Sequence, residues 1–422
     1  MLLKLAIRNT LRYRLRLLLS TLVVVIASLA LVSSIGTIIG TKQTLQDSVI
    51  NTLTGDIIIK PKDSPVDFFK FTSSRRLPVI ESAMVEQVIS KLNSEPSVEA
   101  ASSRIRFGSL IGNNQKSVPA MVMGVDLTAE PKVTTDTQTI IQPILDNLSS
   151  EINQSVLSDY ILGRLNLAHG DEVILFTETP DESFNAMNFN LAGSIATPVL
   201  IDEYVKQAFY IDIKAARELL YLDQSAATEI VIRMSGDAHN DLPSAKAKIQ
   251  ALLSDEQQRH LGVYTYNEVE KSIEGISAIA IGIGAINIGV IFLIMIVTIM
   301  IVTTMTLHER RFEIGTLISL GMSPKSLTQL FMLEVILKIV IGYTVGFILA
   351  ILNLTRINES GGYQATNMLE QYWYGGKVMF PVVDYRIVLL GFVIILFVAL
   401  LSTIRSCSKA GKQDAVALLS HQ

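Results

Sequence analysis

Four long apolar runs interrupt an otherwise mixed polar sequence, and each is long enough to cross a membrane. They occupy residues 17–41, 274–307, 327–355 and 387–404. A helix that crosses a bilayer needs about 20 predominantly apolar residues. The pattern therefore predicts four transmembrane α-helices, one before and three after a long polar stretch.

The lengths of the first two runs indicate how they are used. The run that begins at Leu17 exceeds the roughly 7–15 apolar residues of a signal peptide, so we expect an uncleaved helix. The second run includes Gly275–Leu307, which carries no formal charge. As a helix it would extend for about 50 Å, whereas the hydrocarbon core is about 30 Å thick. We expect one end of this helix to continue beyond the bilayer as a stalk.

The polar stretch 42–273 mixes strand-like and helical patterns. Runs rich in β-branched and apolar residues predict strands at Asp56–Lys60, Ala120–Val125, Glu172–Phe176, Phe209–Ile213 and Glu229–Met234. A period of 3.6 residues predicts helices at Val79–Leu92, Ile213–Leu222 and Pro243–Ser254. Because strands and helices do not alternate strictly, we predict one large α+β domain between the first and second membrane helices.

Charge in the short segments predicts the orientation of the helices. Residues 1–16 contain five basic and no acidic residues, and residues 308–326 contain three basic ones. Basic flanks remain on the cytoplasmic side of a membrane. We predict a multi-pass protein of the bacterial inner membrane. Its expected cytoplasmic segments are 1–16, 308–326 and 405–422, and its expected periplasmic segments are 42–273 and the loop 356–386.

Composition and motifs indicate that the chain is not itself an enzyme. Only 18% of residues are charged, the net charge is −4, and Cys407 is the single cysteine. These values disfavour a nucleic-acid partner and exclude an intramolecular disulfide. The sequence lacks a P-loop and the common hydrolase and metalloprotease motifs. Its five histidines have no metal-ligand spacing, so we expect neither cofactor nor metal in this chain.

Small residues recur four apart in two of the membrane runs. In the second run they are Ala278 with Gly282, Ala280 with Gly284, and Ala285 with Gly289. In the third run they are Gly342, Gly346 and Ala350. Small residues let two helix backbones approach closely in lipid. The pattern fits packing within one subunit and equally an interface with a second permease or an apolar cargo.

Glu334 and Lys338 are an acid and a base inside a predicted membrane helix. Because they are four residues apart with the acid first, they share one helix face and have the favoured order for an ion pair. Charged groups inside a membrane often belong to a functional relay. Their nearness to Lys325 also fits a structural pair at the membrane boundary.

Residues 308–334 have the sequence HERRFEIGTLISLGMSPKSLTQLFMLE. This segment resembles the coupling region of the FtsX-like permease superfamily of ABC transporters, which includes MacB, FtsX and the lipoprotein-releasing LolC and LolE. The family pattern is close to E-R-R-x-E-I-G-x-L-x-x-L-G-M-S, followed by a helix with a glutamate. The matching residues are Glu309, Arg310, Arg311, Glu313, Ile314, Gly315, Leu317, Leu320, Gly321, Met322, Ser323 and Glu334.

Two further stretches are similar to the same family, and one departs from it. Leu5–Asn9 before a basic stretch and Gly163–Ile174 both resemble family elements. Asp414–Leu418 has alanine where the family has proline. The arrangement of one helix followed by three also agrees with the family along the whole chain.

The resemblance implies a permease that works with a separate cytosolic ATPase, which would bind ATP and Mg²⁺, and with a second permease copy or paralogue. Movement of the coupling segment would be transmitted across the membrane to the periplasmic domain, a mechanism called mechanotransmission. We favour release of lipoproteins or other amphiphiles, with a periplasmic carrier as a further partner. Two alternatives are MacB-like export of a peptide or small amphiphile and FtsX-like regulation of an extracytoplasmic hydrolase. Phe68, Phe69 and Phe71 would contact a partner or lipid, or pack locally.

Overall fold

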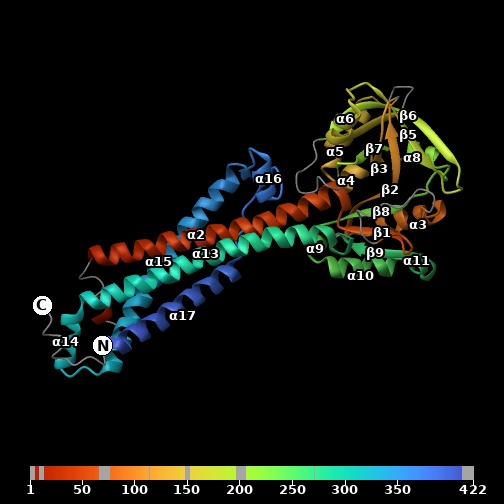
Figure 1. Cartoon of the computed structure of the whole chain (residues 1–422). Helices are drawn as coiled ribbons and strands as arrows, with labels where there is room; N and C mark the ends of the chain where they lie inside the picture. Colours follow the sequence, from red (N-terminus) through yellow and green to blue (C-terminus); the bar gives the residue numbers. More distant parts are fainter. Residues whose placement is uncertain are drawn as a thin grey trace. The chain divides into compact units, whose positions relative to one another are not determined.

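The computed structural model describes residues 5–8, 14–65, 77–113, 115–147, 153–195, 206–269 and 271–410 of the chain. These residues form two compact units (Figure 1). The helical unit comprises Met1–Gln43, Ile279–Ala365 and Val378–Gln422. The sheet unit comprises Thr44–Ala278 and Thr366–Lys377.

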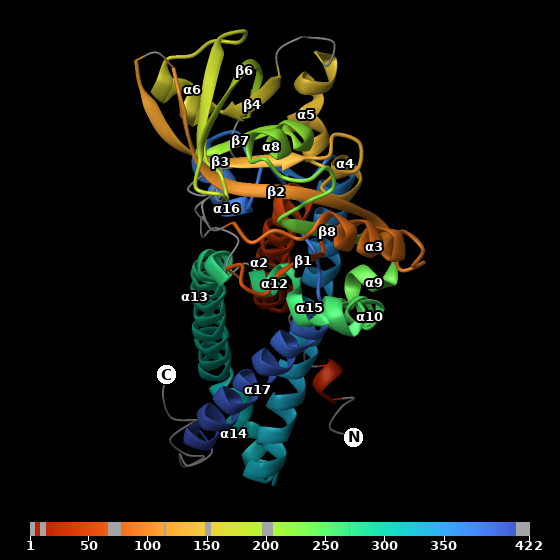
Figure 2. The same ribbon diagram turned by 90° about the vertical axis from the view of Figure 1, so that its right-hand side faces the viewer.

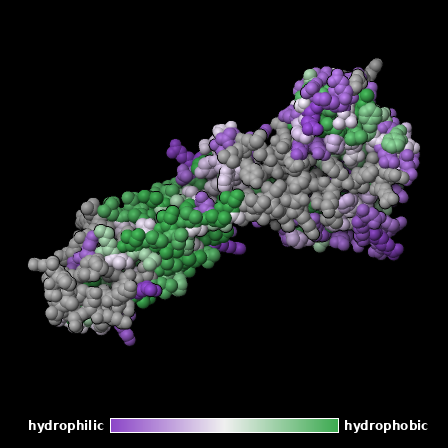
Figure 3. All heavy atoms as spheres, in the orientation of Figure 1, coloured by the Kyte–Doolittle hydropathy of each residue, from purple (hydrophilic) through white to green (hydrophobic). Residues whose placement is uncertain are grey.

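Four long helices make up most of the helical unit. They are α2 (Arg14–Val49), α13 (Lys271–Glu309), α15 (Pro324–Glu359) and α17 (Tyr385–Ala410). Each contains a stretch long and apolar enough to cross a membrane. Hydrophobic residues cover the surface of these helices (Figure 3). The protein is therefore a multi-pass membrane protein, as the four apolar runs predicted.

The helices of this unit pack around a shared apolar core. Val32 of α2, Met295 of α13, Ile339 of α15 and Ile395 of α17 are all buried in it. The hydroxyl of Tyr343 donates a hydrogen bond of 2.8 Å to the backbone oxygen of Val388. This bond satisfies a polar group that would otherwise be costly inside an apolar core.

Short elements join the long helices. Helix α14 (Arg311–Ser319) connects α13 to α15. Between α15 and α17 the strands β10 (Tyr363–Gln364) and β11 (Val378–Met379) form a two-stranded hairpin. Helix α16 (Met368–Tyr374) lies within that connection and belongs to the sheet unit.

The sheet unit is built on one nine-stranded, mixed sheet. Its strands lie in the order β3-β7-β4-β6-β5-β2-β8-β1-β9, and β3 also pairs with β2. The strands are β1 (Ile57–Pro61), β2 (Val98–Gly112), β3 (Ser117–Val125), β4 (Gln154–Ser158), β5 (Glu172–Glu178), β6 (Phe184–Ile195), β7 (Ala208–Asp212), β8 (Glu229–Met234) and β9 (Leu261–Thr265). The extra pairing closes six of them into a ring.

Strand β2 makes this topology possible because it is 15 residues long (Figure 2). Its first half pairs with β8, and residues from Arg104 to Gly112 pair with β3. Its last residues also pair with β5. One strand therefore belongs both to the ring and to the extension formed by β8, β1 and β9.

Short helices cover the sheet and bury three apolar clusters. They are α3 (Ser82–Asn93), α4 (Glu130–Val133), α5 (Thr137–Asp146), α6 (Asp159–Leu165), α8 (Ile213–Leu219), α9 (Asp237–Asn240), α10 (Leu242–Leu252), α11 (Asp255–His260) and α12 (Tyr266–Val269). Helices α6 and α8 pack on one face of the ring, around Phe107 and Phe209. Helices α4 and α5 pack on the opposite face, around Met123 and Ile141.

The predicted α+β class is confirmed, and every predicted strand and helix of this stretch overlaps an observed element. The prediction missed β2, β4, β6 and β9 and the shorter helices. Phe68, Phe69 and Phe71 lie outside the described residues, as does Asp414–Leu418, so the expectations for both stay predictions.

Candidate functional site

The turn between α13 and α15 is organised by local signals in the sequence. Gly321 adopts a positive φ of 87°, which glycine tolerates better than other residues, and it follows the end of α14. Ser323 then caps α15, because its side chain accepts a hydrogen bond from the backbone NH of Ser326. Pro324 occupies the first turn, where its missing NH is harmless. The segment therefore has a defined shape.

Apolar side chains fix α14 against the start of α15. Ile314 of α14 is buried with Leu327 and Phe331 of α15. Leu317 and Met322 pack against this small cluster. The cluster holds α14 on the first turns of the following membrane helix.

A buried ion pair adds a second connection between the same elements. Arg310 lies at the beginning of α14, and one of its guanidinium nitrogens is 2.8 Å from a carboxylate oxygen of Glu334 in α15. The side chains are only 6% and 1% exposed. Removing one partner of such a pair leaves an uncompensated buried charge and costs about 3–5 kcal/mol. The pair therefore specifies how α14 sits on α15.

In this arrangement Glu334 has a partner other than the predicted Lys338. No ion pair within 4.0 Å joins these two side chains, although the structure describes both. Glu334 instead binds a residue 24 positions earlier in the chain. The i, i+4 rule considers one helix alone, whereas the folded turn brings the Arg310 guanidinium to the carboxylate and offers it several donors.

The other residues of the predicted coupling segment divide into buried and exposed groups. Gly315 is buried. Glu313 is partly exposed, and its Oε2 atom lies 3.9 Å from Nε of Arg310. Glu309 and Gly321 are exposed, and Leu320 is 79% exposed. The side chain of Arg311 lies outside the described residues. An exposed leucine beside a fixed turn offers an apolar contact to a partner.

The small residues of α15 face α2 of the same chain. A Cβ atom added to Gly342 would lie 2.7 Å from the Cβ atom of Val24, and one added to Gly346 would lie 2.5 Å from the backbone oxygen of Val25. Separations under 3.0 Å are too short for carbon atoms that are not bonded. These two glycines therefore serve packing within the subunit.

The glycines of α13 do not share one role. A Cβ atom on Gly284 would lie 2.6 Å from the side chain of Ile38 in α2. Gly282 and Gly289 are exposed, and a Cβ atom on either would meet nothing within 4 Å. Their role at an interface with a second permease or with cargo stays a prediction.

Sequence analysis missed a glycine pair on α2. The backbone oxygen of Gly36 accepts a hydrogen bond of 3.0 Å from the NH of Val382. A Cβ atom on Gly40 would lie 2.9 Å from the Cα atom of Pro381. The connection before α17 therefore lies directly on α2. Gly36 and Gly40 have the same four-residue spacing as the pairs that were recognised.

A buried polar cluster lies where α2 ends inside the sheet unit. The helix continues as the π-helix η1 (Ile50–Thr54), and Gly55 then turns the chain into β1 with φ of 59°. Arg104 of β2 donates a hydrogen bond of 2.5 Å to the backbone oxygen of Leu53. The same guanidinium binds the carboxylates of Glu130 and Glu229. A cation thus caps the carbonyl end of the helix.

Electrostatics keep this cluster ionised. Burial opposes ionisation of Glu229, but Arg106 and Arg104 outweigh it and lower its pKa. Burial likewise opposes the charge of Arg104, but Glu130 and Glu229 outweigh it and raise its pKa. Burial raises the pKa of Tyr210, next to these charges, to about 12.

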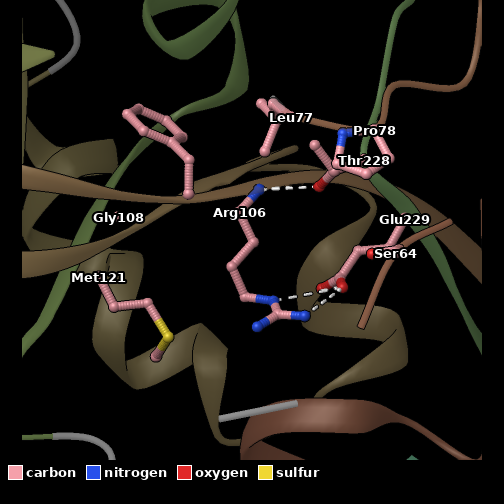
Figure 4. Close-up of a pocket in the computed structure, with 9 residues that line it drawn as sticks. Ser64, Leu77, Pro78, Arg106, Gly108, Met121, Thr228 and Glu229 are labelled. Atoms are coloured by element: carbon pink, nitrogen blue, oxygen red, sulfur yellow. Dashed lines mark hydrogen bonds and ion pairs between the residues drawn. The ribbon is translucent and has the colours of Figure 1, made fainter. Parts of the chain in front are cut away.

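A small pocket borders the cluster (Figure 4). Arg106 points across it, and its guanidinium lies 3.2 Å from a carboxylate oxygen of Glu229. Leu77, Gly108 and Met121 supply apolar or small walls. The carboxylate is engaged by arginines, and the residues described contain no group of three or more metal ligands.

Comparison with known proteins assigns the C-terminal helices of the chain to a class. Residues 285–415 match the family described as FtsX-like permease C-terminal. This part of the chain is therefore an FtsX-like permease domain, of the type found in ABC transporters. The match includes the whole of α14 and the glycines Gly342 and Gly346.

Solved structures similar to the chain cover about half of it. The periplasmic region of MacB from Actinobacillus actinomycetemcomitans aligns with 54% of this chain and 95% of its own, at 12% identity and a TM-score of 0.33. The extracellular domain of the noncanonic ABC-type transporter YknZ from Gram-positive bacteria aligns with 50% and 100%, at 9% identity and a TM-score of 0.31. No curated protein sequence matches the chain.

Proposed function

We propose that this chain is the permease subunit of an ABC transporter, is driven by a separate cytosolic ATPase, and works by mechanotransmission. In this proposal α14 binds the ATPase, and its displacement reaches the sheet unit through the membrane helices. The chain lies in the bacterial inner membrane with both termini in the cytoplasm and the sheet unit in the periplasm. ATP and Mg²⁺ are bound by the partner, and a second permease completes the transporter.

One observation carries the proposal: α14 is anchored on one side and exposed on the other. Ile314 and the pair of Arg310 and Glu334 fasten it to α15. Leu320 stands 79% exposed beside it. An element that transmits movement from a soluble partner to a membrane helix needs this combination. If α14 were not anchored on α15, it would move without displacing that helix.

The favoured work of the transporter is release of lipoproteins or other amphiphiles from the membrane. Support comes from the plan of the chain, in which one membrane helix precedes and three follow a large sheet unit. MacB-like export and FtsX-like regulation of a hydrolase share this plan. They predict different partners: a lipoprotein or its carrier for release, an outer-membrane duct for export, and a cell-wall hydrolase for regulation.

Substitution of Leu320 tests the proposal. We expect Leu320→Glu to abolish co-purification of an ABC ATPase with the tagged full chain, because the exposed apolar contact becomes charged. Phe184→Glu is the matched control, since Phe184 is 86% exposed but belongs to the sheet unit. Equal ATPase recovery with both variants would contradict the proposal. Charge reversal of Arg310 is less informative, because a buried repulsion with Glu334 would disturb the fold itself.

A further inference from the structure

An exposed row of apolar residues crosses four strands of the sheet unit. Leu110 of β2 lies opposite Pro119 of β3 on one side and Phe176 of β5 on the other, and Phe176 lies opposite Ala186 of β6. Leu110 and Phe176 are 49% and 45% exposed, and Pro119 and Ala186 are exposed as well. We call these four residues, together with Phe184, the hairpin face.

Phe184 extends the hairpin face toward the turn between β5 and β6. It is 86% exposed, and it lies two residues from Ala186, so both point to the same side of the sheet. The opposite side of these strands is filled by Leu175 and Phe189, which are fully buried. The core of the ring is thus complete without the hairpin face. Contiguous exposed apolar residues of this kind mark interaction sites.

Acidic residues flank the hairpin face at the turn between β5 and β6. Phe184 lies opposite Glu178 in the sheet, and Asp181 and Glu182 occupy the turn between them. No lysine or arginine occurs between Arg164 and Lys206. Residues 44–278 as a whole contain 32 acidic and 19 basic residues, a formal charge of −13. Hydrophilic and hydrophobic residues meet at the surface of this unit (Figure 3).

Charge selects among the possible occupants of this face. An anionic membrane surface would be repelled by the acidic turn. A second copy of the sheet unit carries the same formal charge of −13 and would place acid against acid. A cationic partner gains from the same field, both in encounter rate and in complementarity.

We propose that the hairpin face binds a cationic amphipathic segment of a partner protein. The apolar side chains of this segment would cover Leu110, Phe176 and Phe184. Its lysines or arginines would bind the acidic turn at Asp181 and Glu182. Removal of exposed phenylalanine surface from water contributes to the affinity. The acidic turn gives the choice of partner.

A pair of synthetic peptides tests this proposal. One alternates lysine with phenylalanine, and the other has glutamate at every lysine position. Binding of each fluorescent peptide to the purified full chain is measured by anisotropy, with empty micelles of the same non-ionic detergent as the blank. We expect the lysine peptide to bind and the glutamate peptide to bind at least about 10-fold more weakly.

Variants locate the binding. We expect two double variants to bind the lysine peptide at least about 10-fold more weakly than the wild type. One is Phe176→Ser with Phe184→Ser, and the other is Asp181→Lys with Glu182→Lys. All four positions are exposed, so thermal unfolding should change little. Tyr221→Asn is the control, because Tyr221 is 65% exposed in the same unit and its positive φ of 54° suits asparagine.

Several results would overturn the proposal. One is equal binding of the lysine peptide by the double phenylalanine variant and the Tyr221 control. Another is equal binding of the two peptides. Preferential binding of wild type to anionic phosphatidylglycerol vesicles, lost in the phenylalanine variant, would assign the face to lipid. Concentration-dependent self-association lost in the same variant would assign it to a second copy.

Discussion

Single residues decide how α14 is held, and Arg310 is the central one. Its guanidinium is buried against the carboxylate of Glu334, so each charge compensates the other. The same logic applies to Arg104 in the sheet unit, which joins Leu53 to two carboxylates. Arg310 connects two consecutive helices, whereas Arg104 connects elements far apart in the sequence.

We predict a large penalty for breaking the pair of Arg310 and Glu334 and a recovery when both charges are removed. Arg310→Met should destabilise the detergent-solubilised chain by about 3–5 kcal/mol, because the buried carboxylate of Glu334 loses the charge of Arg310. Arg310→Met with Glu334→Leu should regain much of that loss. Thermal unfolding of the two variants gives the comparison. A double variant no more stable than the single one would show that the pair is not the cause.

Because Tyr210 is buried, we predict that the folded chain loses stability at alkaline pH. Its pKa is raised from 10.0 to about 12 by burial, so the neutral form is favoured in the folded state. The resulting stabilisation is complete below pH 10 and is lost as pH rises through about 12, since the unfolded chain ionises first. A pKa difference of two units corresponds to a loss of about 3 kcal/mol in the free energy of unfolding.

The matched variant for this prediction is Tyr210→Phe. The Tyr210 hydroxyl is buried and makes no hydrogen bond with the residues described, so its removal should raise stability at neutral pH by about 1 kcal/mol. Between pH 10 and 12 the free energy of unfolding should fall for the wild type but not for the variant. Parallel curves over that interval would contradict the assignment.

At the scale of elements, α2 is the helix on which others pack. Gly342 and Gly346 of α15 and Gly284 of α13 lie against it, and its own Gly36 and Gly40 accept the chain before α17. Small residues at these positions bring the backbones close enough for dispersion contacts, which drive helix association in lipid. Helix α2 also continues into η1, where Arg104 caps it.

Leucine substitutions should separate the packed glycines from the exposed ones. Gly346→Leu should lower the melting temperature and expression of the full chain, because its Cβ atom alone would lie 2.5 Å from a backbone oxygen of α2. Gly289→Leu is the control, since a Cβ atom there meets nothing within 4 Å. Equal melting temperatures for the two variants would contradict this packing.

At the scale of the whole molecule, one chain joins two units whose surfaces differ in polarity. The helical unit exposes apolar side chains, as lipid requires, and the sheet unit buries its own apolar clusters behind a polar surface. The sheet unit is acidic, and the remaining residues carry a formal charge of +9. This separation of charge fits the proposed orientation, with the basic flanks in the cytoplasm.

Cysteine labelling of intact cells tests that orientation. In a Cys407→Ser background, Phe184→Cys should react with an impermeant maleimide added outside the inner membrane, and Glu309→Cys should react only after lysis. Both positions are exposed, so access to the reagent depends on the side of the membrane alone. Reaction of both cysteines before lysis, or of Glu309→Cys alone, would overturn the proposed orientation.

The sequence by itself determined the features that depend on neighbours along the chain. Length and apolarity specify four membrane helices, because a helix satisfies its own backbone groups in lipid. Periodicity specified the α+β character of the sheet unit, and Gly321, Ser323 and Pro324 marked the turn after α14 through local backbone chemistry. The small-residue spacing identified helix faces that favour close packing.

Only the tertiary structure decided which distant residues meet. Spacing suggested Lys338 as the partner of Glu334, but the folded turn supplies Arg310. The long β2 was missed because its residues change partners midway, from β8 to β3 and β5, so no single period covers it. The contacts of Arg104 span up to 125 positions in the chain. Such contacts depend on the path of the backbone in space, which local patterns do not encode.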